Sequence, residues 1–181
     1  MTGASRDTLI AELVRRRGDG LVRYAFLLTG DVPTAQDLVQ DALVKVFVRL
    51  RAHPQAELAE AYVRRAIVSL YIDGHRRRRR FAGIQHLVAT QDEWSGPDTP
   101  AYLDLHAALA TLSTQERAAV VLRYFGDLTV GEVADEMGLA LGTVKRYLHT
   151  AIGKLEQRLG PLPPSDDGDP LSVTTAPRGR R

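Results

Sequence analysis

The sequence predicts an all-α protein of two small helical domains joined by a flexible linker, the second being a four-helix domain with a helix-turn-helix. Apolar residues recur at spacings of three and four, whereas no segment of useful length alternates with the period of two that a strand requires. Residues 82–102 carry two Pro, two Gly and three acidic residues, a composition typical of a linker. With 44% apolar residues among 181, the chain can bury a core.

The first domain, residues 1–81, is expected to contain helices over about 5–17, 20–29, 31–50 and 57–79. Gly30 ends the second helix, because glycine favours the left-handed conformation that follows many helices. Asp31 is placed to cap the third helix. Pro54 separates the third helix from the fourth, since proline disfavours helix at the residue before it and cannot continue one.

The second domain, residues 103–160, is preceded by the linker and followed by a tail, residues 161–181. Its helices are expected over about 101–111, 114–124, 130–138 and 142–159. Two of these begin with a capping box, Ser113-x-x-Glu116 and Thr129-x-x-Glu132, in which each side chain bonds the other residue's backbone N–H. The tail is rich in Pro, Asp, Gly and Ser, which predicts disorder.

The net charge of +2 conceals segregated charges. The segment from Arg64 to Arg80 holds seven Arg and one Asp, a formal charge of +6. The segment from Asp31 to Asp41 holds three Asp and no basic residue, a charge of −3. Local charge determines which partners a surface attracts, so these segments predict two different partners.

The sequence lacks the residues and motifs that disulfide-bonded proteins, metal-binding proteins and common enzyme classes require. The chain has no Cys, so it can form neither a disulfide nor a thiolate metal site. The five His lack the spacing of paired ligands, and no phosphate-binding or nucleophile motif occurs. We therefore expect no metal, no cofactor and no enzymatic activity. No apolar stretch approaches the roughly 20 residues of a membrane span, so a cytoplasmic protein without membrane insertion is expected.

The segment from Val130 to Leu148, VGEVADEMGLALGTVKRYL, has the pattern of a helix-turn-helix. Ala134 is small where two helices cross, Gly138 ends the first helix, and the second helix is basic. In this motif the second helix enters the major groove of DNA. The alternative is a helical hairpin that serves only the core. The side chains that the second helix would present to DNA are Thr143, Lys145, Arg146 and His149.

The arginine run from Arg76 to Arg80 ends a helix that also carries Tyr62, Arg64, Arg65, Ser69 and Tyr71. Arginine binds phosphate through paired hydrogen bonds and stacks on exposed bases, so one interpretation is a surface for single-stranded or junction DNA. A solvated helix end, a localisation signal or a general polyanion patch are the alternatives.

The helix expected over about 31–50 carries apolar residues outside the face that is expected to pack in the core. Asp37, Gln40 and Asp41 lie near its start, and Val44 and Val48 occupy outer positions. Surplus valines next to a polar start suggest a surface for a protein partner. Scattered surface valines of no special function are the alternative.

Three segments together resemble one protein family. These segments are LVRYAFLLTGDVPTAQDLVQDALVKVFVRL, AYVRRAIVSLYIDGHRRRRR and TLSTQERAAVVLRYFGDLTVGEVADEMGLALGTVKRYLHTAIGKL. In this order they are similar to the extracytoplasmic-function (ECF, group 4) sigma factors of bacterial RNA polymerase, most of all to the actinobacterial type. The resemblance covers about residues 6–80 and 103–159.

The resemblance implies a subunit that binds core polymerase and directs promoter recognition and transcription initiation. Residues 1–81 would be sigma region 2 and residues 103–160 sigma region 4. Region 2 would bind the clamp helices of the largest polymerase subunit, and region 4 the flap of the second-largest. The surface for the clamp helices would comprise Asp37, Leu38, Gln40, Asp41, Val44 and Val48. An anti-sigma factor is a further possible partner.

Promoter DNA would contact both domains. Region 2 opens the −10 element, and the residues that match its DNA-binding part are Arg51, His53, Tyr62, Arg64, Arg65, Ser69, Arg76, Arg77 and Arg78. Region 4 reads the −35 element through Thr143, Lys145, Arg146 and His149. The chain departs from the family at Ser69, where Asn is frequent, at Gly74, where a large residue is frequent, and at Tyr147. A stand-alone helix-turn-helix regulator and an adaptor that binds polymerase without initiating are the alternative functions.

Overall fold

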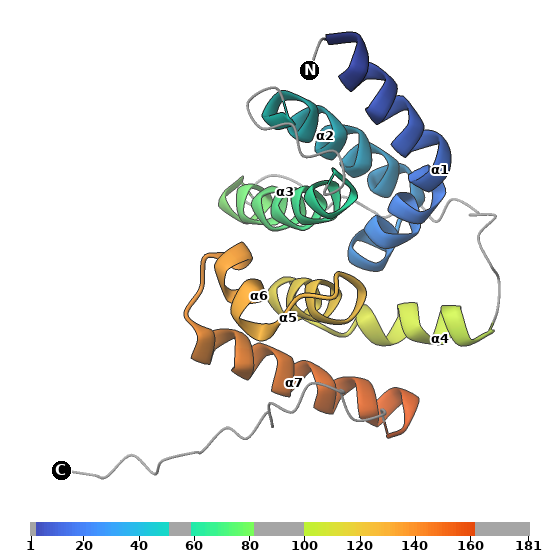
Figure 1. Cartoon of the computed structure of the whole chain (residues 1–181). Helices are drawn as coiled ribbons and strands as arrows, with labels where there is room; N and C mark the ends of the chain where they lie inside the picture. Colours follow the sequence, from blue (N-terminus) through green and yellow to red (C-terminus); the bar gives the residue numbers. More distant parts are fainter. Residues whose placement is uncertain (1–2, 51–58, 82–99, 162–181) are drawn as a thin grey trace.

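The computed structural model describes residues 3–50, 59–81 and 100–161, and all of its regular elements in these ranges are helical. The helices are α1 (Gly3–Thr29), α2 (Val32–Leu50), α3 (Ala59–Phe81), α4 (Pro100–Leu109), α5 (Thr114–Val120), the π-helical turn η2 (Val121–Phe125), α6 (Val130–Met137) and α7 (Leu141–Leu159). Helices α1–α3 form the first helical domain and α4–α7 the second (Figure 1).

Helix α1 corrects the prediction of two separate helices over 5–17 and 20–29, because it runs unbroken through Gly18 and Gly20. A Cβ atom at Gly18 would meet only Val14 Cγ1, at 3.7 Å, so no steric demand requires glycine there. Glycine inside a helix costs roughly 0.5–1 kcal/mol relative to alanine. Burial of the apolar side chains in the following turns, such as Leu21 and Leu28, offsets that cost.

The first domain is a three-helix bundle in which α2 packs against both α1 and α3. Helix α2 starts where expected, since Asp31 Oδ2 accepts a hydrogen bond from Thr34 N at 2.8 Å. Its inner face buries Ala35, Val39, Ala42 and Val46. Helix α3 continues through Gly74 and ends at Phe81.

The second domain is organised around α5, which packs against α7. Both predicted capping boxes are present, at Ser113 and Glu116 and at Thr129 and Glu132. Helix α4 begins at Pro100, inside the predicted linker of 82–102. Residues 82–99 of that linker and residues 162–181 of the predicted tail lie outside the described residues.

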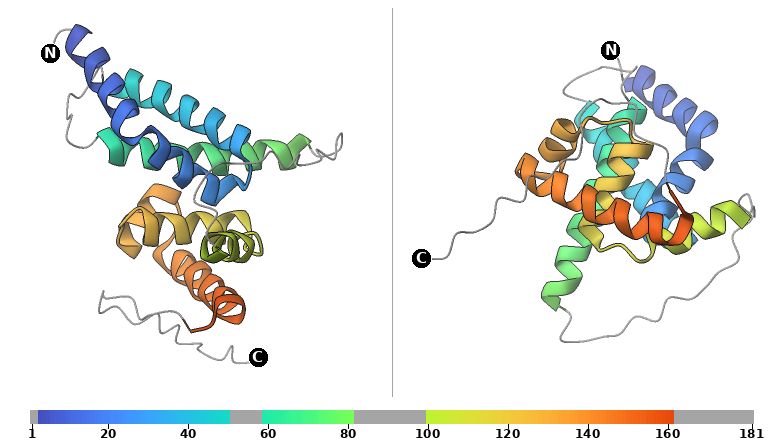
Figure 2. Two further views of the ribbon diagram at one scale, coloured as in Figure 1. Left: turned by 90° about the vertical axis from the view of Figure 1, so that its right-hand side faces the viewer. Right: turned by 90° about the horizontal axis from the view of Figure 1, so that it is seen from below.

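The two domains contact each other along α1 and α3 on one side and α4, α5, η2 and α6 on the other. Both views of Figure 2 show α5 lying against the first domain. The buried apolar side chains of the two domains form a single continuous cluster, from Leu21 in α1 to Leu155 in α7. The prediction of two domains joined by a flexible linker did not include this contact between them. Among the described helices, none is both long and apolar enough to cross a membrane.

Candidate nucleic-acid and polymerase interfaces

An exposed stripe runs along the outer face of α2. Asp37, Asp41, Val44 and Val48 follow one another at spacings of three and four, so they lie on one side of the helix. Val44 is 65% exposed and Val48 is 60% exposed. Gln40 is also exposed, whereas Leu38 is partly buried against the core. Among the predicted partner residues, Leu38 is therefore the one that contributes to packing as well.

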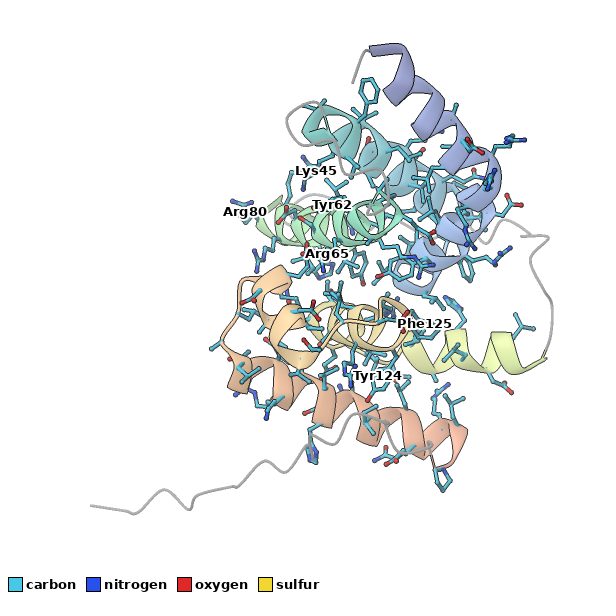
Figure 3. The ribbon with its side chains drawn as sticks, in the orientation of Figure 1. Lys45, Tyr62, Arg65, Arg80, Tyr124 and Phe125 are labelled. Carbon is cyan, nitrogen blue, oxygen red and sulfur yellow. The ribbon has the colours of Figure 1, made fainter. Side chains whose placement is uncertain are left out.

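Helix α3 presents its predicted DNA-binding residues in two groups. Arg76, Arg77 and Arg78 are exposed at its C-terminal end. Arg64 and Arg65, about three turns earlier, are partly buried and face the second domain. Figure 3 shows Arg65 directed toward the second domain and Arg80 at the end of α3.

The remaining residues predicted to bind at the −10 element differ in their surroundings. Tyr62 is partly buried. Ser69 Oγ accepts a hydrogen bond from Lys45 Nζ at 3.2 Å, which ties α3 to α2. Arg51 and His53 lie outside the described residues.

A groove is lined both by the acidic start of α2 and by the basic end of α3. Its lining includes Asp37 and Asp41 from α2 and Arg76 and Arg77 from α3. The segregation of charge along the sequence thus becomes two neighbouring surfaces of opposite sign. Each can attract a partner of its own.

Helices α6 and α7 form the predicted helix-turn-helix. Gly138 adopts the left-handed conformation (φ 62°, ψ 40°) that ends α6, and Leu139 N donates to Ala134 O at 3.0 Å. The side chains that hold the two helices together are buried: Val133, Ala134, Met137, Val144 and Leu148. Helix α7 also presents polar and basic side chains outward, among them Arg146 and His149.

The predicted base-reading residues occupy the N-terminal half of α7. Arg146 and His149 are exposed, and Thr143 and Lys145 are partly buried. The Arg146 guanidinium lies 5.9 Å from the centre of the Tyr147 ring. Tyr147 itself packs partly into the core. The position at which the chain departs from the family pattern therefore contributes to packing.

Sequence reasoning missed the residues that join the domains. Arg64 Nη1 donates to Phe125 O at 2.6 Å, and Arg117 Nη1 donates to Leu28 O at 2.8 Å. Arg65 also pairs with Glu136 at 3.9 Å. No local pattern signals such contacts, because they join positions 61 to 89 residues apart.

Aromatic and titratable groups line the same contact. The rings of Phe26 and His106 lie 4.7 Å apart between centres. Tyr24 is buried under the Arg64 guanidinium, which lies 5.1 Å from its ring centre, and burial raises the pKa of the Tyr24 phenol. Burial, followed by the nearby Arg117 charge, lowers the pKa of His106. In the part of the chain that the structure describes, no group of three His, Cys, Asp or Glu side chains gathers to bind a metal.

A three-helix bundle with an acidic and apolar stripe, a basic helix end and a helix-turn-helix defines a DNA-binding protein that also offers a surface to a protein partner. A model of sigma-70 region 2 matches residues 13–81, and a model of sigma-70 region 4 matches residues 102–155. The chain belongs to the sigma-70 family, and within it to the ECF sigma factors of RNA polymerase.

Individual relatives agree with this placement. The RNA polymerase sigma-E factor of Streptomyces coelicolor is 33% identical over 153 residues, which cover 82% of this chain and 84% of the relative. The ECF RNA polymerase sigma factor SigL of Mycobacterium tuberculosis is 32% identical over 173 residues, which cover 88% and 93%. The actinobacterial type predicted from the sequence is thereby confirmed.

A solved structure shares the fold. The sigma factor RpoE of Bartonella quintana, in complex with the anti-sigma factor NepR, superposes with a TM-score of 0.63 at 22% identity. The match covers 82% of this chain and 95% of RpoE. The two family models and the curated relatives, rather than this structure, show that the chain is a sigma factor that acts with RNA polymerase in promoter recognition and transcription initiation.

Proposed function

We propose that the exposed α2 stripe binds the clamp helices of the largest polymerase subunit. The observation that carries this assignment is the exposure of Val44 and Val48, beside Asp37 and Asp41, on a helix whose opposite face is buried. Burying apolar side chains stabilises association, and the flanking carboxylates give the contact its orientation.

The two DNA surfaces follow from charge and geometry. Residues 1–81 act as region 2, whose α3 arginines (Arg64, Arg65 and Arg76–Arg78) hold the opened −10 element. Residues 103–160 act as region 4, in which Arg146 and His149 reach base edges of the −35 element from an exposed helix face. Residues 82–102 connect them, and region 4 contacts the flap of the second-largest subunit.

The chain acts in the cytoplasm and performs no chemistry of its own, since the polymerase supplies the catalytic site. RpoE of Bartonella quintana was solved with an anti-sigma factor, and a partner of that kind is proposed here too. Because the chain has no Cys, redox sensing through thiols would belong to that partner.

The assignment is tested by run-off transcription with purified core polymerase. We expect promoter-dependent transcript only when the chain is added. The double variant Val44→Ser/Val48→Ser should lose binding to core while retaining its helical content, because both side chains are exposed. Val14→Ser, on α1, is the matched control, since Val14 is 43% exposed but lies outside the stripe.

The results separate the alternatives. Duplex DNA binding without any effect of core polymerase would favour the stand-alone regulator. Binding to core without promoter-dependent transcript would favour the adaptor. Equal binding of core by the double variant and by the parent chain would contradict the role of the α2 stripe.

A further inference from the structure

Leu141 is an exposed apolar side chain at the first position of α7, the second helix of the helix-turn-helix. Its exposed fraction is 48%. Other apolar side chains hold this part of the domain together: Leu139 packs against the core before the helix begins, and Val144 and Leu148 are buried in its following turns. Packing of α7 therefore does not depend on Leu141, and the fold leaves this side chain open to a partner.

The start of α7 carries no polar cap. Helices α5 and α6 each begin with a capping box, built on Ser113 and Thr129. Helix α7 begins with Ala140 as its N-cap, and no side-chain hydrogen bond caps it. A Ser, Thr, Asp or Asn at this place would stabilise the helix. Instead Ala140, Leu141 and Gly142 follow one another, all exposed and without a polar side chain. Contact with another molecule here therefore removes no polar side chain from water.

The backbone of this first turn is fixed and uncovered. Ala140 O accepts hydrogen bonds from Thr143 N at 2.8 Å and from Val144 N at 3.2 Å. A Cβ atom at Gly142 would meet no described atom within 4 Å. Glycine weakens a helix relative to alanine, and it is common where a backbone approaches a ligand closely. The first turn thus presents Leu141 in a defined position beside an exposed stretch of backbone.

Leu141 belongs to the surface of α7 that is proposed to bind DNA. Lys145 and His149 follow Leu141 at spacings of four, so the three side chains form one line along the helix. Arg146, next to this line, is exposed as well. In a helix-turn-helix, side chains near the N-terminus of the second helix contact base edges. Leu141 occupies the N-terminal end of this surface.

The chemistry of the major groove indicates what an apolar side chain contacts there. The base edges present hydrogen-bond donors and acceptors, and thymine alone adds a C5-methyl group. A leucine can bury that methyl group, whereas it leaves a donor or an acceptor of another base without a hydrogen bond. An exposed leucine at this position therefore favours an A·T base pair whose thymine methyl group faces it.

We propose that Leu141 recognises a thymine of the −35 element through its C5-methyl group and is a specificity-determining residue. This inference rests on the proposed role of α7 in binding the −35 element. The thymine lies at the end of the element that faces the N-terminus of α7, beside the bases that Arg146 contacts. Leu141 discriminates by apolar contact, whereas Arg146 and His149 discriminate through hydrogen bonds.

Replacement of single thymines by uracil tests the proposal, because uracil lacks only the methyl group. Selection from a pool of random duplexes with core polymerase and this chain identifies the preferred −35 element. Each thymine of that element, on either strand, is then replaced in turn. At one thymine the parent holoenzyme should lose about fourfold in affinity, the contribution of one buried methyl group. Replacement of a thymine outside the promoter elements is the control and should have no effect.

Variants of Leu141 show whether this side chain is responsible. Leu141→Ala should bind the thymine and uracil duplexes equally, whereas Leu141→Met keeps an apolar side chain of similar volume and should still prefer thymine. Leu103→Ala is the matched control, because Leu103 is 57% exposed on α4 of the same domain. It should keep the preference of the parent chain. Circular dichroism should show unchanged helical content for all three variants, since alanine and methionine favour a helix.

The outcomes separate this proposal from the underlying function. A preferred −35 element without thymine, or the same ratio of thymine to uracil binding in the parent and in Leu141→Ala, would overturn the reading by Leu141. If selection yields no preferred sequence in the −35 region, the proposed role of α7 fails as well. If Arg146→Ala changes the preferred element but uracil has no effect at any thymine, only the role of Leu141 fails.

Discussion

Gly30 and His106 approach so closely that a Cβ atom on Gly30 would lie 2.7 Å from His106 Nε2. Gly30 ends α1 with a φ of 74°, and His106 comes from α4 of the other domain. The left-handed turn that stops the helix therefore also makes room for a side chain of region 4. One glycine serves both the local structure of region 2 and the contact between the domains.

Gly30→Ala is expected to weaken the domain contact. An alanine there would carry roughly 1–2 kcal/mol of backbone strain and would also collide with the His106 ring. The free energy of unfolding should fall, and so should the energy transfer between fluorophores attached to Arg23→Cys in the first domain and Gln157→Cys in the second. Gly138→Ala is the control, because Gly138 has a φ of 62° and nothing within 4 Å of its Cβ position. Gly138→Ala should lower the free energy of unfolding and leave the energy transfer between the domains unchanged. A loss of energy transfer in both variants would contradict a specific role of Gly30.

Acidification is expected to open the domain contact through His106. Burial and the Arg117 charge lower the pKa of His106 from its ordinary value of 6.5. Contact between the domains therefore favours the neutral ring, and the ring binds a proton more readily when the domains are apart. The contact should have its full strength above about pH 6.5 and weaken as the pH falls below that value. Energy transfer measured from pH 7.5 to about pH 5.5 should decrease, and His106→Gln should flatten the dependence. A decrease of the same size in His106→Gln would assign the effect to other groups.

The sequence predicted best those features that adjacent residues determine. Apolar spacing identified the helices, the serine and threonine capping boxes located the starts of α5 and α6, and Gly138 located the turn of the helix-turn-helix. The single helix α1 was missed, because local propensity placed a break at Gly18 and Gly20 where packing of the next turns prevails.

The sequence predicted which residue types form the candidate site, but not which of them contact other residues of the chain. The pattern placed Arg64 and Arg65 on a helix predicted to bind DNA, yet nothing near them in sequence indicated Phe125 or Glu136 as partners. Contacts between domains depend on how two surfaces meet in space. Which residues meet there cannot be read from the sequence around each of them.

Glu116 is expected to stabilise region 4 more than its counterpart Glu132. Both residues close a capping box, but buried Glu116 also accepts a hydrogen bond from Lys154 Nζ at 2.7 Å, which links α5 to α7. Glu132→Ala should cost about 0.5–2 kcal/mol, as the loss of a cap does. Glu116→Ala should cost about 1–3 kcal/mol more, because a charge-assisted hydrogen bond is lost as well. Urea unfolding followed by circular dichroism measures both, and equal losses would show that the Lys154 contact contributes nothing.

The pH dependence of stability has a second part, at lower pH. Burial opposes ionisation of Glu116, but the hydrogen bonds from Lys154 and Ser113 outweigh it, so the pKa lies below its ordinary 4.5. Its contribution is present above about pH 4.5 and is lost as the pH falls through the lowered pKa. Unfolding midpoints of the parent chain should decline below that value more steeply than those of Glu116→Gln. This window is separate from that of His106.

Neutralising Arg76, Arg77 and Arg78 together is expected to weaken promoter complexes and flatten their salt dependence. These side chains are exposed at the end of α3, so their removal should leave the fold intact. If each contacts a phosphate, the log–log slope should fall by roughly 2 to 3, since each contact contributes about 0.7 to 0.9. The control neutralises Arg15, Arg16 and Arg17, which lie on α1 near Glu12 and Glu60. An unchanged slope would assign the α3 run to solvation.

Arg146 is expected to determine part of the −35 preference. It is exposed on α7, one turn from exposed His149, so both can reach the same groove wall. A good base contact discriminates by roughly 1–3 kcal/mol, so Arg146→Ala should weaken binding to the preferred −35 sequence by that amount and bind altered sequences almost as before. Lys145→Ala, at a partly buried neighbour, serves as a comparison within the same helix. Affinities of holoenzyme for a panel of promoters with single changes in the −35 element provide the measurement. A uniform loss across the panel would make Arg146 a phosphate contact, because only a base contact makes the loss depend on sequence.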